Sequence, residues 1–299
     1  MKTTRMMICI LLLVAVMSAM VPVPRGEVTH IENNKTPLGV GTAVPVPEQG
    51  GSAEATADED YSHPVEVTTL VSDSGVLSVS IDTQNTARMK VKITKGDETI
   101  YYDVDSDYQV EIPLQMGDGS YTVKVFSHLE GNDYQAVFSE DIAFASENPN
   151  DVFLASSDIV NFSESKTLDS VTNQVVDGAT DEMEIVERIT NYVIDELEYD
   201  TQKAATLDAN YVPNIDNVLS DKSGICYDFA AVTASMLREA GVPAKLVMGY
   251  RSDSDLYHAW NEVLVDGEWM IVDTTWDNVM NHHHMSVQNP GLYSAEKVF

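Results

Sequence analysis

Positive charge is scarce in this sequence, and the shortage excludes one large class of partners. The 299 residues hold 17 lysines and arginines against 48 aspartates and glutamates, which gives a formal net charge of −31 at pH 7. Binding to a phosphate backbone requires a basic surface, so the composition excludes a role in nucleic-acid binding. We interpret the acidic excess as a well-solvated exterior, which also suits cationic or amine-bearing substrates.

Cysteine is scarcer still, because the chain contains only Cys9 and Cys226. Residues 1–20 have the layout of a secretory signal peptide: positive charges, an apolar run over residues 6–16, and small residues ahead of two prolines. Cys9 lies inside the apolar run, too early for a lipid-attachment cysteine, and is lost when the signal is cleaved. An uncleaved anchor is the alternative, since residues 6–23 reach the lower limit of about 18 residues for a bilayer span.

Cleavage leaves Cys226 as the single cysteine of a protein that is secreted or held at the cell surface. It then has no partner for an intramolecular disulfide, so three roles are open: a buried inert thiol, an intermolecular link or a reactive nucleophile. A membrane is a partner only if the signal segment stays uncleaved. The oligomeric state is left open.

Two regions of different character precede the segment around Cys226. Residues 21–64 are rich in proline, glycine, alanine, threonine and acidic residues and have no helical or strand periodicity, so we expect a disordered linker. Residues 65–147 instead show about seven short runs of alternating apolar residues, several of them separated by turn clusters. This rhythm predicts a small antiparallel β-sandwich of the immunoglobulin-like kind, although the region contains neither cysteine nor tryptophan.

The region of residues 148–299 has helical periodicity at first and forms a second predicted domain. One helix begins near Cys226 and runs to about Arg238, and Gly241 and Pro243 end it. A cysteine in the first helical turn lies beside unpaired backbone N–H groups and the positive end of the helix dipole, which favour a thiolate. The same N–H groups can stabilise an oxyanion on an attacked carbonyl.

A predicted β-hairpin brings a histidine and an aspartate together. The turn Asp266-Gly267 joins the runs HAWNEVLV and EWMIVDTT, and such a dipeptide is typical of a two-residue hairpin loop. If the residues flanking the turn pair with each other, His258 and Asp273 share one face of the sheet as diagonal neighbours about 7 Å apart. The second strand is expected to run through Thr275.

Three sequence runs together resemble the transglutaminase-like superfamily of exported bacterial proteins: GICYDFAAVTASMLREAGVPAKLVMGY, HAWNEV and VDTTWD. The resemblance covers residues 152–299 and implies an α+β fold, with a papain-like, transglutaminase-like C-terminal domain after the immunoglobulin-like β-sandwich. It assigns Cys226 as the acyl-accepting nucleophile, His258 as the general base and acid, and Asp273 as the orienting residue. The implied reaction forms a thioester from a peptide or glutamine carboxamide, which water hydrolyses or a primary amine converts into a crosslink.

Four further residues are candidates for supporting roles. Trp260 matches the family's tryptophan after the histidine, either as a site residue or as packing over the predicted pair. Tyr211 is the upstream candidate for an oxyanion side chain. Asp253 and Asp255 lie in a polar loop just before the histidine, where we expect them to line the rim of a cleft and to favour cationic substrates.

No metal and no cofactor are expected. Aspartates alternate over residues 103–107 as at the start of a calcium-binding loop, but Tyr108 stands where that loop needs glycine and Leu114 where it needs a bidentate glutamate. The adjacent histidines at 282–284 cannot easily aim three rings at one ion, and no second ligand motif accompanies them. The family resemblance implies no calcium requirement.

Two other classes of function compete with an exported acyl-transfer enzyme that acts on protein or peptide substrates, including substrates at the cell surface. A transglutaminase-like module can be catalytically inactive and serve for binding or as a scaffold, but the complete set of Cys226, His258 and Asp273 favours the enzyme. Alternatively, Cys226 is an inert thiol, in which case alkylation is slow and insensitive to His258→Ala. Hydrolysis and transfer are both open at this stage, as is the substrate.

Overall fold

The computed structural model describes residues 28–30, 65–84, 86–104, 108–163, 165–207, 211–254 and 256–299. The predicted signal peptide lies outside these residues, as do Asp105, Asp107 and Asp255. Most of the predicted linker lies outside them too. Within it, however, Val28–His30 form strand β1, which pairs with strand β8 (Asp133–Phe144), so the chain is part of a sheet there.

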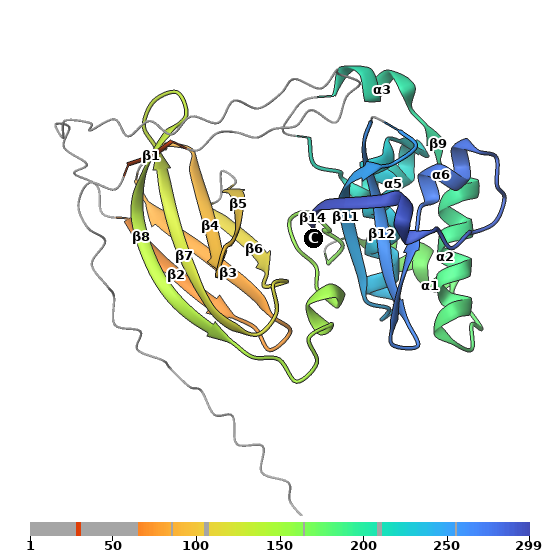
Figure 1. Ribbon diagram of the computed structural model, residues 1–299, viewed down its shortest axis with the longest axis horizontal. Helices are drawn as coiled ribbons and strands as arrows, with labels where there is room; N and C mark the ends of the chain where they lie inside the picture. The colour runs from red at the N-terminus through yellow and green to blue at the C-terminus, as the bar shows by residue number, and fades with distance from the viewer. Residues whose placement is uncertain are drawn as a thin grey trace, which may run out of the picture.

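Two antiparallel sheets make up the β-rich N-terminal region (Figure 1). The larger has the order β1-β8-β7-β4-β5 and the smaller the order β2-β3-β6. Leu77 and Ile112 of the smaller sheet share one buried core with Met89 and Val123 of the larger, which is the burial that alternating apolar residues predict. The remaining strands are β2 (Val65–Val71), β3 (Val76–Thr83), β4 (Met89–Lys95), β5 (Glu98–Val104), β6 (Gln109–Pro113) and β7 (Gly119–His128).

The C-terminal region combines helices with a four-stranded antiparallel sheet of order β13-β12-β11-β14 (Figure 1). Its elements are the 3-10 helix η1 (Asp151–Leu154), α1 (Lys166–Val175), α2 (Glu182–Glu196), β9 (Glu198–Tyr199), α3 (Thr201–Thr206), α4 (Ile215–Asp221), β10 (Ser223–Gly224), α5 (Cys226–Glu239), β11 (Ala244–Arg251), β12 (Tyr257–Val265), β13 (Glu268–Val272), α6 (Thr274–Val279), the 3-10 helix η2 (Pro290–Leu292) and β14 (Tyr293–Val298). The described chain is therefore a mixture of helices and strands, with its helices in the C-terminal region.

Helix α5 is the centre of the C-terminal region, because every residue from Cys226 to Arg238 is buried. Strand β12 fastens it to the sheet through Asn261, whose side-chain amide donates to the carbonyl oxygen of Ala230 at 3.0 Å. The helix ends as the sequence predicts, since Gly241 takes a left-handed φ of 82° directly after its last turn. A helix this enclosed holds its first residue in a fixed place.

The hairpin between β12 and β13 has the register expected from the Asp266-Gly267 turn, because Val265 pairs with Glu268. The expected length of its second strand is wrong. The strand ends at Val272, before Asp273, which is the N-cap of α6. Aspartate is depleted in strands and favoured at helix starts, because its short side chain can accept a hydrogen bond from the first helical turn.

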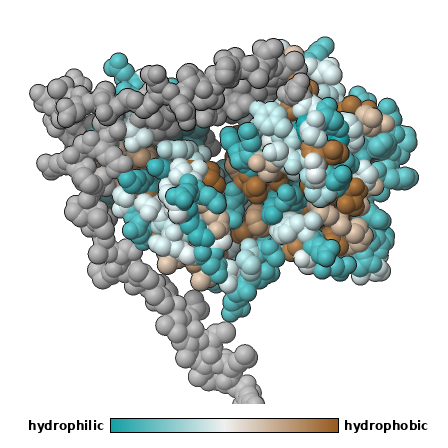
Figure 2. All heavy atoms as spheres, viewed as in Figure 1, coloured by the Kyte–Doolittle hydropathy of each residue, from teal (hydrophilic) through white to brown (hydrophobic). Residues whose placement is uncertain are grey.

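The surface of the C-terminal region carries both hydrophobic and hydrophilic side chains. In the view of Figure 2, hydrophobic residues are interspersed with hydrophilic ones on that lobe rather than joined into one continuous sheet of apolar atoms. Within the part of the chain that the structure describes, no helix has both the length and the apolar character needed to cross a membrane.

Candidate active site

The predicted nucleophile opens the buried helix. Cys226 is the first residue of α5, it is 7% exposed, and its thiol is free. The approach to it is tight, because a Cβ on Gly224 would lie 2.5 Å from the Cβ of Asp228. Only Ile225 separates the end of β10 from the start of the helix. Because Cys226 is in the first turn, its thiol lies next to the unpaired backbone N–H groups there.

The predicted base and orienting residue are in direct contact. Nε2 of His258 lies 2.7 Å from Oδ2 of Asp273; the carboxylate is fully buried and the imidazole is 16% exposed. Cys226 lies near enough to His258 to be among the causes that raise the pKa of the imidazole. Because Nε2 is engaged by the aspartate, Nδ1 is the ring nitrogen left to face the thiol. The fold thus joins the three predicted residues in series, while their catalytic roles stay a prediction.

The surroundings of His258 favour its protonated form. Burial lowers the pKa of His258, but the charge of Asp273, the hydrogen bond to Asp273 and the contacts with Cys226 together raise it from 6.5 to about 10. An imidazolium is therefore expected at neutral pH. A cation beside a thiol stabilises the thiolate, which is the nucleophilic form of cysteine.

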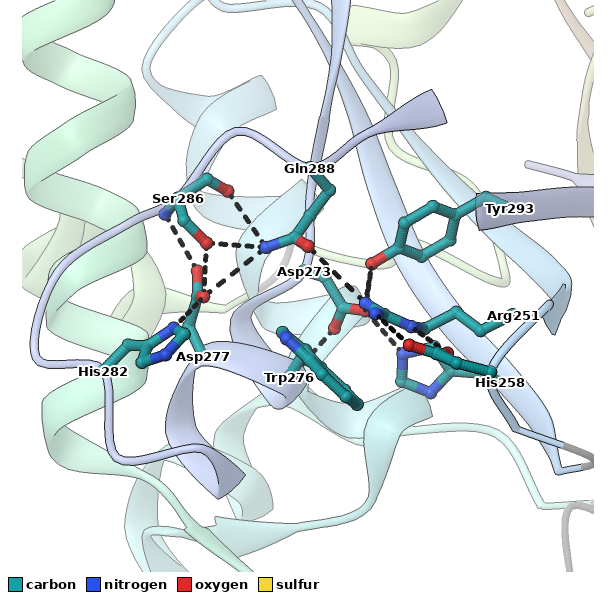
Figure 3. Close-up of polar contacts among 10 residues, drawn as sticks. Arg251, His258, Asp273, Trp276, Asp277, His282, Ser286, Gln288 and Tyr293 are labelled. Carbon is teal, nitrogen blue, oxygen red and sulfur yellow. Dashed lines mark hydrogen bonds and ion pairs between the residues drawn. The ribbon is translucent and has the colours of Figure 1, made fainter. Parts of the chain in front are cut away.

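Asp273 has further partners that the sequence did not reveal (Figure 3). Its Oδ1 accepts the backbone N–H of Trp276 at 2.9 Å, and its Oδ2 accepts the hydroxyl of Tyr293, also at 2.9 Å. The guanidinium of Arg251 lies 3.9 Å from the same Oδ2 and donates to the hydroxyl oxygen of Tyr293 at 2.6 Å. Tyr293 and Arg251 come from β14 and β11, so the neighbours of the carboxylate are supplied from several elements.

We expected Asp253 and Asp255, in the loop before His258, to favour cationic substrates, but the charge of Asp253 is already paired. Asp253 binds Arg251 with both carboxylate oxygens, each at 2.8 Å. The hydrogen bond and charge of Arg251 also lower the pKa of Asp253. Its negative charge is therefore already paired and is not free for a substrate, and Asp255 lies outside the described residues.

A second buried carboxylate fixes the start of α5. Asp228 is fully buried and accepts the backbone N–H of Ile225 at 2.8 Å and the ammonium of Lys203 at 2.7 Å. The hydroxyl of Tyr211 also donates to Asp228. Tyr211 was the sequence candidate for an oxyanion donor, but its proton points to this carboxylate. Its observed contact thus supports the start of the helix.

Another tyrosine, Tyr199, lies near enough to Cys226 for the charge of that cysteine to affect its pKa. Tyr199 is half-buried and is paired with Gly224 through the parallel strands β9 and β10. Burial, followed by the charges of Cys226 and Asp228, raises the pKa of Tyr199 to about 12, so its hydroxyl stays a donor. No sequence signal pointed to it, because a strand of two residues has no readable periodicity.

Trp260 serves as packing beside the pair. It is 1% exposed, and its ring lies nearly parallel to that of His258 with centroids 6.3 Å apart. On its other side it contacts the ring of Tyr293 at a centroid distance of 4.9 Å. The tryptophan therefore fills the space between the imidazole and the last strand.

The three adjacent histidines lie in the loop after α6. His282 is hydrogen bonded through Nδ1 to Asp277 at 3.0 Å, and Asp277 also accepts the backbone N–H of Ser286 at 2.9 Å (Figure 3). These contacts tie the loop to α6. Among the described residues, no group of three or more histidine, cysteine, aspartate or glutamate side chains is arranged to hold a metal ion.

Comparison with known proteins gives a family match that includes Cys226, His258 and Asp273. Residues 169–274 match the family model described as "Transglutaminase-like superfamily". The chain is also similar to the kyphoscoliosis peptidases of Mus musculus and Homo sapiens, at 28% and 29% identity over 119 residues. Each alignment covers 36% of this chain and 18% of the relative, so the chain spans less than a fifth of the length of these curated proteins.

Two solved structures illustrate the structural likeness. The periplasmic domain of TgpA from Pseudomonas aeruginosa has 17% sequence identity and a TM-score of 0.37, with 70% of this chain and 72% of that chain covered. Red sea bream transglutaminase has 13% identity and a TM-score of 0.30, with 73% and 50% covered.

Proposed function

The chain belongs to the transglutaminase-like superfamily through residues 169–274, and we propose that it is a cysteine-dependent acyl-transfer enzyme acting on peptide or glutamine carboxamide bonds. One observation carries the proposal. Cys226 lies near enough to His258 to raise the pKa of the imidazole, and His258 is hydrogen bonded at 2.7 Å to the buried carboxylate of Asp273. A nucleophile, a base and an orienting group in this series is the arrangement that covalent catalysis requires.

In the first half of the proposed reaction, the thiolate of Cys226 attacks the carbonyl carbon and a C–S bond forms. The C–N bond breaks as the imidazolium of His258 gives its proton to the departing nitrogen, so that ammonia or an amine leaves and a thioester is left. The N–H groups at the start of α5 can stabilise the oxyanion between these steps. The hydroxyl of Tyr199, which lies near enough for the charge of Cys226 to raise its pKa, is our candidate for the additional donor.

The second half depends on a change in the pKa of His258. Contacts with Cys226 are among the causes that raise this pKa, and the thioester carries no charge. Formation of the thioester therefore moves the pKa of His258 down, so the neutral imidazole can take a proton from the next nucleophile. Attack by water forms a C–O bond and attack by a primary amine forms a C–N bond. In both cases the C–S bond breaks, which releases the acid or the new amide and returns Cys226.

Export of the protein and an immunoglobulin-like form of its N-terminal region are also parts of the proposal. The signal-like composition of residues 1–20 supports export from the cytoplasm, to the cell surface or the outside. The two sheets that share a core support an immunoglobulin-like β-sandwich, which would act as a support for the catalytic region. Its substrates would then be exported or surface proteins and peptides.

The test is mass spectrometry of full-length protein incubated with cell-surface peptides and an isotope-labelled primary amine. Wild type is compared with Cys226→Ala. The control is Ser235→Ala, which removes a buried hydroxyl of the same helix that has no hydrogen-bond partner among the described residues. We expect a product with wild type and Ser235→Ala that is absent with Cys226→Ala: incorporated label indicates transfer and cleaved peptides indicate hydrolysis. No product with wild type would contradict the proposal and favour an inactive binding module.

A further inference from the structure

Strand β14, which follows all three sequence motifs, supplies Tyr293 to the candidate site. Strand β14 pairs antiparallel with β11, and Tyr293 lies directly opposite Arg251 in that pairing. The approach of the two strands is close at Gly249, where a Cβ would lie 2.0 Å from the carbonyl oxygen of Ser294. Only a glycine leaves room there, so the sequence of β11 allows β14 to bring Tyr293 against the site.

Tyr293 and His258 bind the same atom. The tyrosine hydroxyl is 2.9 Å and the imidazole Nε2 is 2.7 Å from Oδ2 of Asp273. Burial, and then the charge and hydrogen bond of Asp273, raise the pKa of Tyr293, so the hydroxyl keeps its proton and stays a donor. The two donors therefore share the negative charge on one carboxylate oxygen.

Arg251 holds this arrangement in place. It is 4% exposed, and its guanidinium donates to the hydroxyl oxygen of Tyr293 at 2.6 Å while lying over the ring of Trp276 at 3.7 Å. Its other nitrogens are fixed by the carboxylate of Asp253. Because Arg251 occupies an acceptor site of the hydroxyl, the proton of Tyr293 is directed to Asp273 (Figure 3).

We propose that Tyr293, oriented by Arg251, is a positioning residue that withdraws part of the negative charge of Asp273 from His258. This inference rests on the proposed function, in which His258 must both give and accept a proton. Tyr293 does not touch the reacting atoms. It acts through Asp273, and it sets how firmly the imidazole holds its proton.

The consequence concerns the second half of the reaction. A general acid and base works best when its pKa lies near the working pH. Among the described residues, the charged and titratable groups around the His258–Asp273 pair are Cys226 on α5, Asp253 and Arg251 on the β11 side, and Tyr293 on β14. Cys226 loses its charge in the thioester, so Asp273 and its other donors then decide when the imidazole becomes a base.

The experiment titrates His258 by NMR in full-length protein whose Cys226 has been blocked with methyl methanethiosulfonate. The His258 signal is identified by its loss in His258→Ala. We expect Tyr293→Phe to raise the pKa of His258 by about one pH unit, because the carboxylate of Asp273 then loses one of its two donors on Oδ2 and holds the imidazolium more strongly. The matched control is Tyr250→Phe, which also removes a tyrosine hydroxyl. Tyr250 is next to Arg251 in the sequence, but its ring contacts Tyr257.

A second variant keeps the test usable if Tyr293→Phe folds poorly. Arg251→Lys retains a cation but not the planar fork that orients the hydroxyl, and it should raise the pKa of His258 by a smaller amount. A pKa unchanged or lowered in both variants overturns the inference. Titrating the unblocked wild type in the same way gives the proposed function its own readout: if blocking Cys226 does not lower the pKa of His258, the thiol and imidazole are not coupled and that function is wrong, whatever Tyr293 does.

Discussion

Replacing Asp273 by asparagine should reverse the proton arrangement of the site. Oδ1 of Asp273 accepts the backbone N–H of Trp276 at 2.9 Å, so the asparagine oxygen is expected to take that position. Its NH2 group then faces Nε2 of His258 and can only donate. The imidazole must accept at Nε2 and carry its proton on Nδ1, which is the nitrogen that faces Cys226. A neutral ring in this tautomer cannot take a proton from the thiol.

The expected loss of activity is large, and the expected loss of stability depends on pH. Holding the base in the wrong tautomer should lower kcat/KM by roughly 10³–10⁴. In the wild type the pKa of His258 is raised from 6.5 to about 10, which corresponds to roughly 5 kcal/mol of stabilisation at 1.36 kcal/mol per pH unit. This amount is the net result of contacts with Asp273 and Cys226 acting against the cost of burial, so roughly 5 kcal/mol sets the order of magnitude of the effect of the substitution and is not a limit.

The sign of the pH dependence follows from the direction of the shift. A histidine whose pKa is higher in the folded than in the unfolded state adds stability that is fully present below the unfolded pKa and disappears as the pH rises through the folded pKa. The difference in unfolding free energy between wild type and Asp273→Asn should therefore be largest at pH 6.5 and below, and should shrink as the pH approaches about 10.

Urea denaturation followed by tryptophan fluorescence at several pH values between 6 and 10 measures this difference. The control is Asp277→Asn, which removes another fully buried carboxylate from α6 that binds His282 and Ser286 rather than His258. A stability difference for Asp273→Asn that stays constant or grows toward pH 10 would refute the reasoning, because the imidazolium would then not be stabilised by Asp273.

Three further predictions concern the elements around the site. Gly249→Ala should lower the unfolding free energy by about 1–3 kcal/mol, because the new Cβ would lie 2.0 Å from the carbonyl oxygen of Ser294; an unchanged urea midpoint would contradict the close approach. Asp228→Asn removes the anion that binds Lys203 at 2.7 Å, and we expect the unfolding free energy to fall by about 1–3 kcal/mol. The thiol of Cys226 should also react more slowly with iodoacetamide. An unchanged alkylation rate would show that Asp228 does not influence the nucleophile. Tyr199→Phe should lower kcat roughly 100-fold with the alkylation rate unchanged, and equal turnover would remove it from the oxyanion site.

The parts of the site that the sequence predicted are those that local rules determine. The position of Cys226 follows from a helix start between a glycine and a run of apolar residues, and the structure begins α5 at that residue. The contact between His258 and Asp273 follows from the Asp266-Gly267 turn, because a two-residue loop sets the register of both strands. Each of these inferences needs only neighbours within one hairpin or one helix.

Predictions failed where two local rules competed or where the pattern was too short. Continued alternation pointed to a strand through Thr275, but the capping ability of Asp273 prevailed and started α6. The capping is useful to the site, since it fixes Oδ1 and leaves Oδ2 for the imidazole. Strand β1 has three residues, and a run of that length in a region rich in proline and glycine cannot be distinguished from linker.

The groups that tune Asp273 could not be predicted, because they depend on pairing between distant strands. Arg251 and Tyr293 are 42 positions apart, and β14, whose central residues are exposed, shows no alternation that would reveal its face. A chain that keeps all three motifs but lacks Tyr293 would still have Cys226, His258 and Asp273 in sequence. By the argument above, its histidine would hold a proton more firmly. If the proposed function holds, the motifs identify the reacting groups, whereas β14 sets the pH range in which they can exchange a proton.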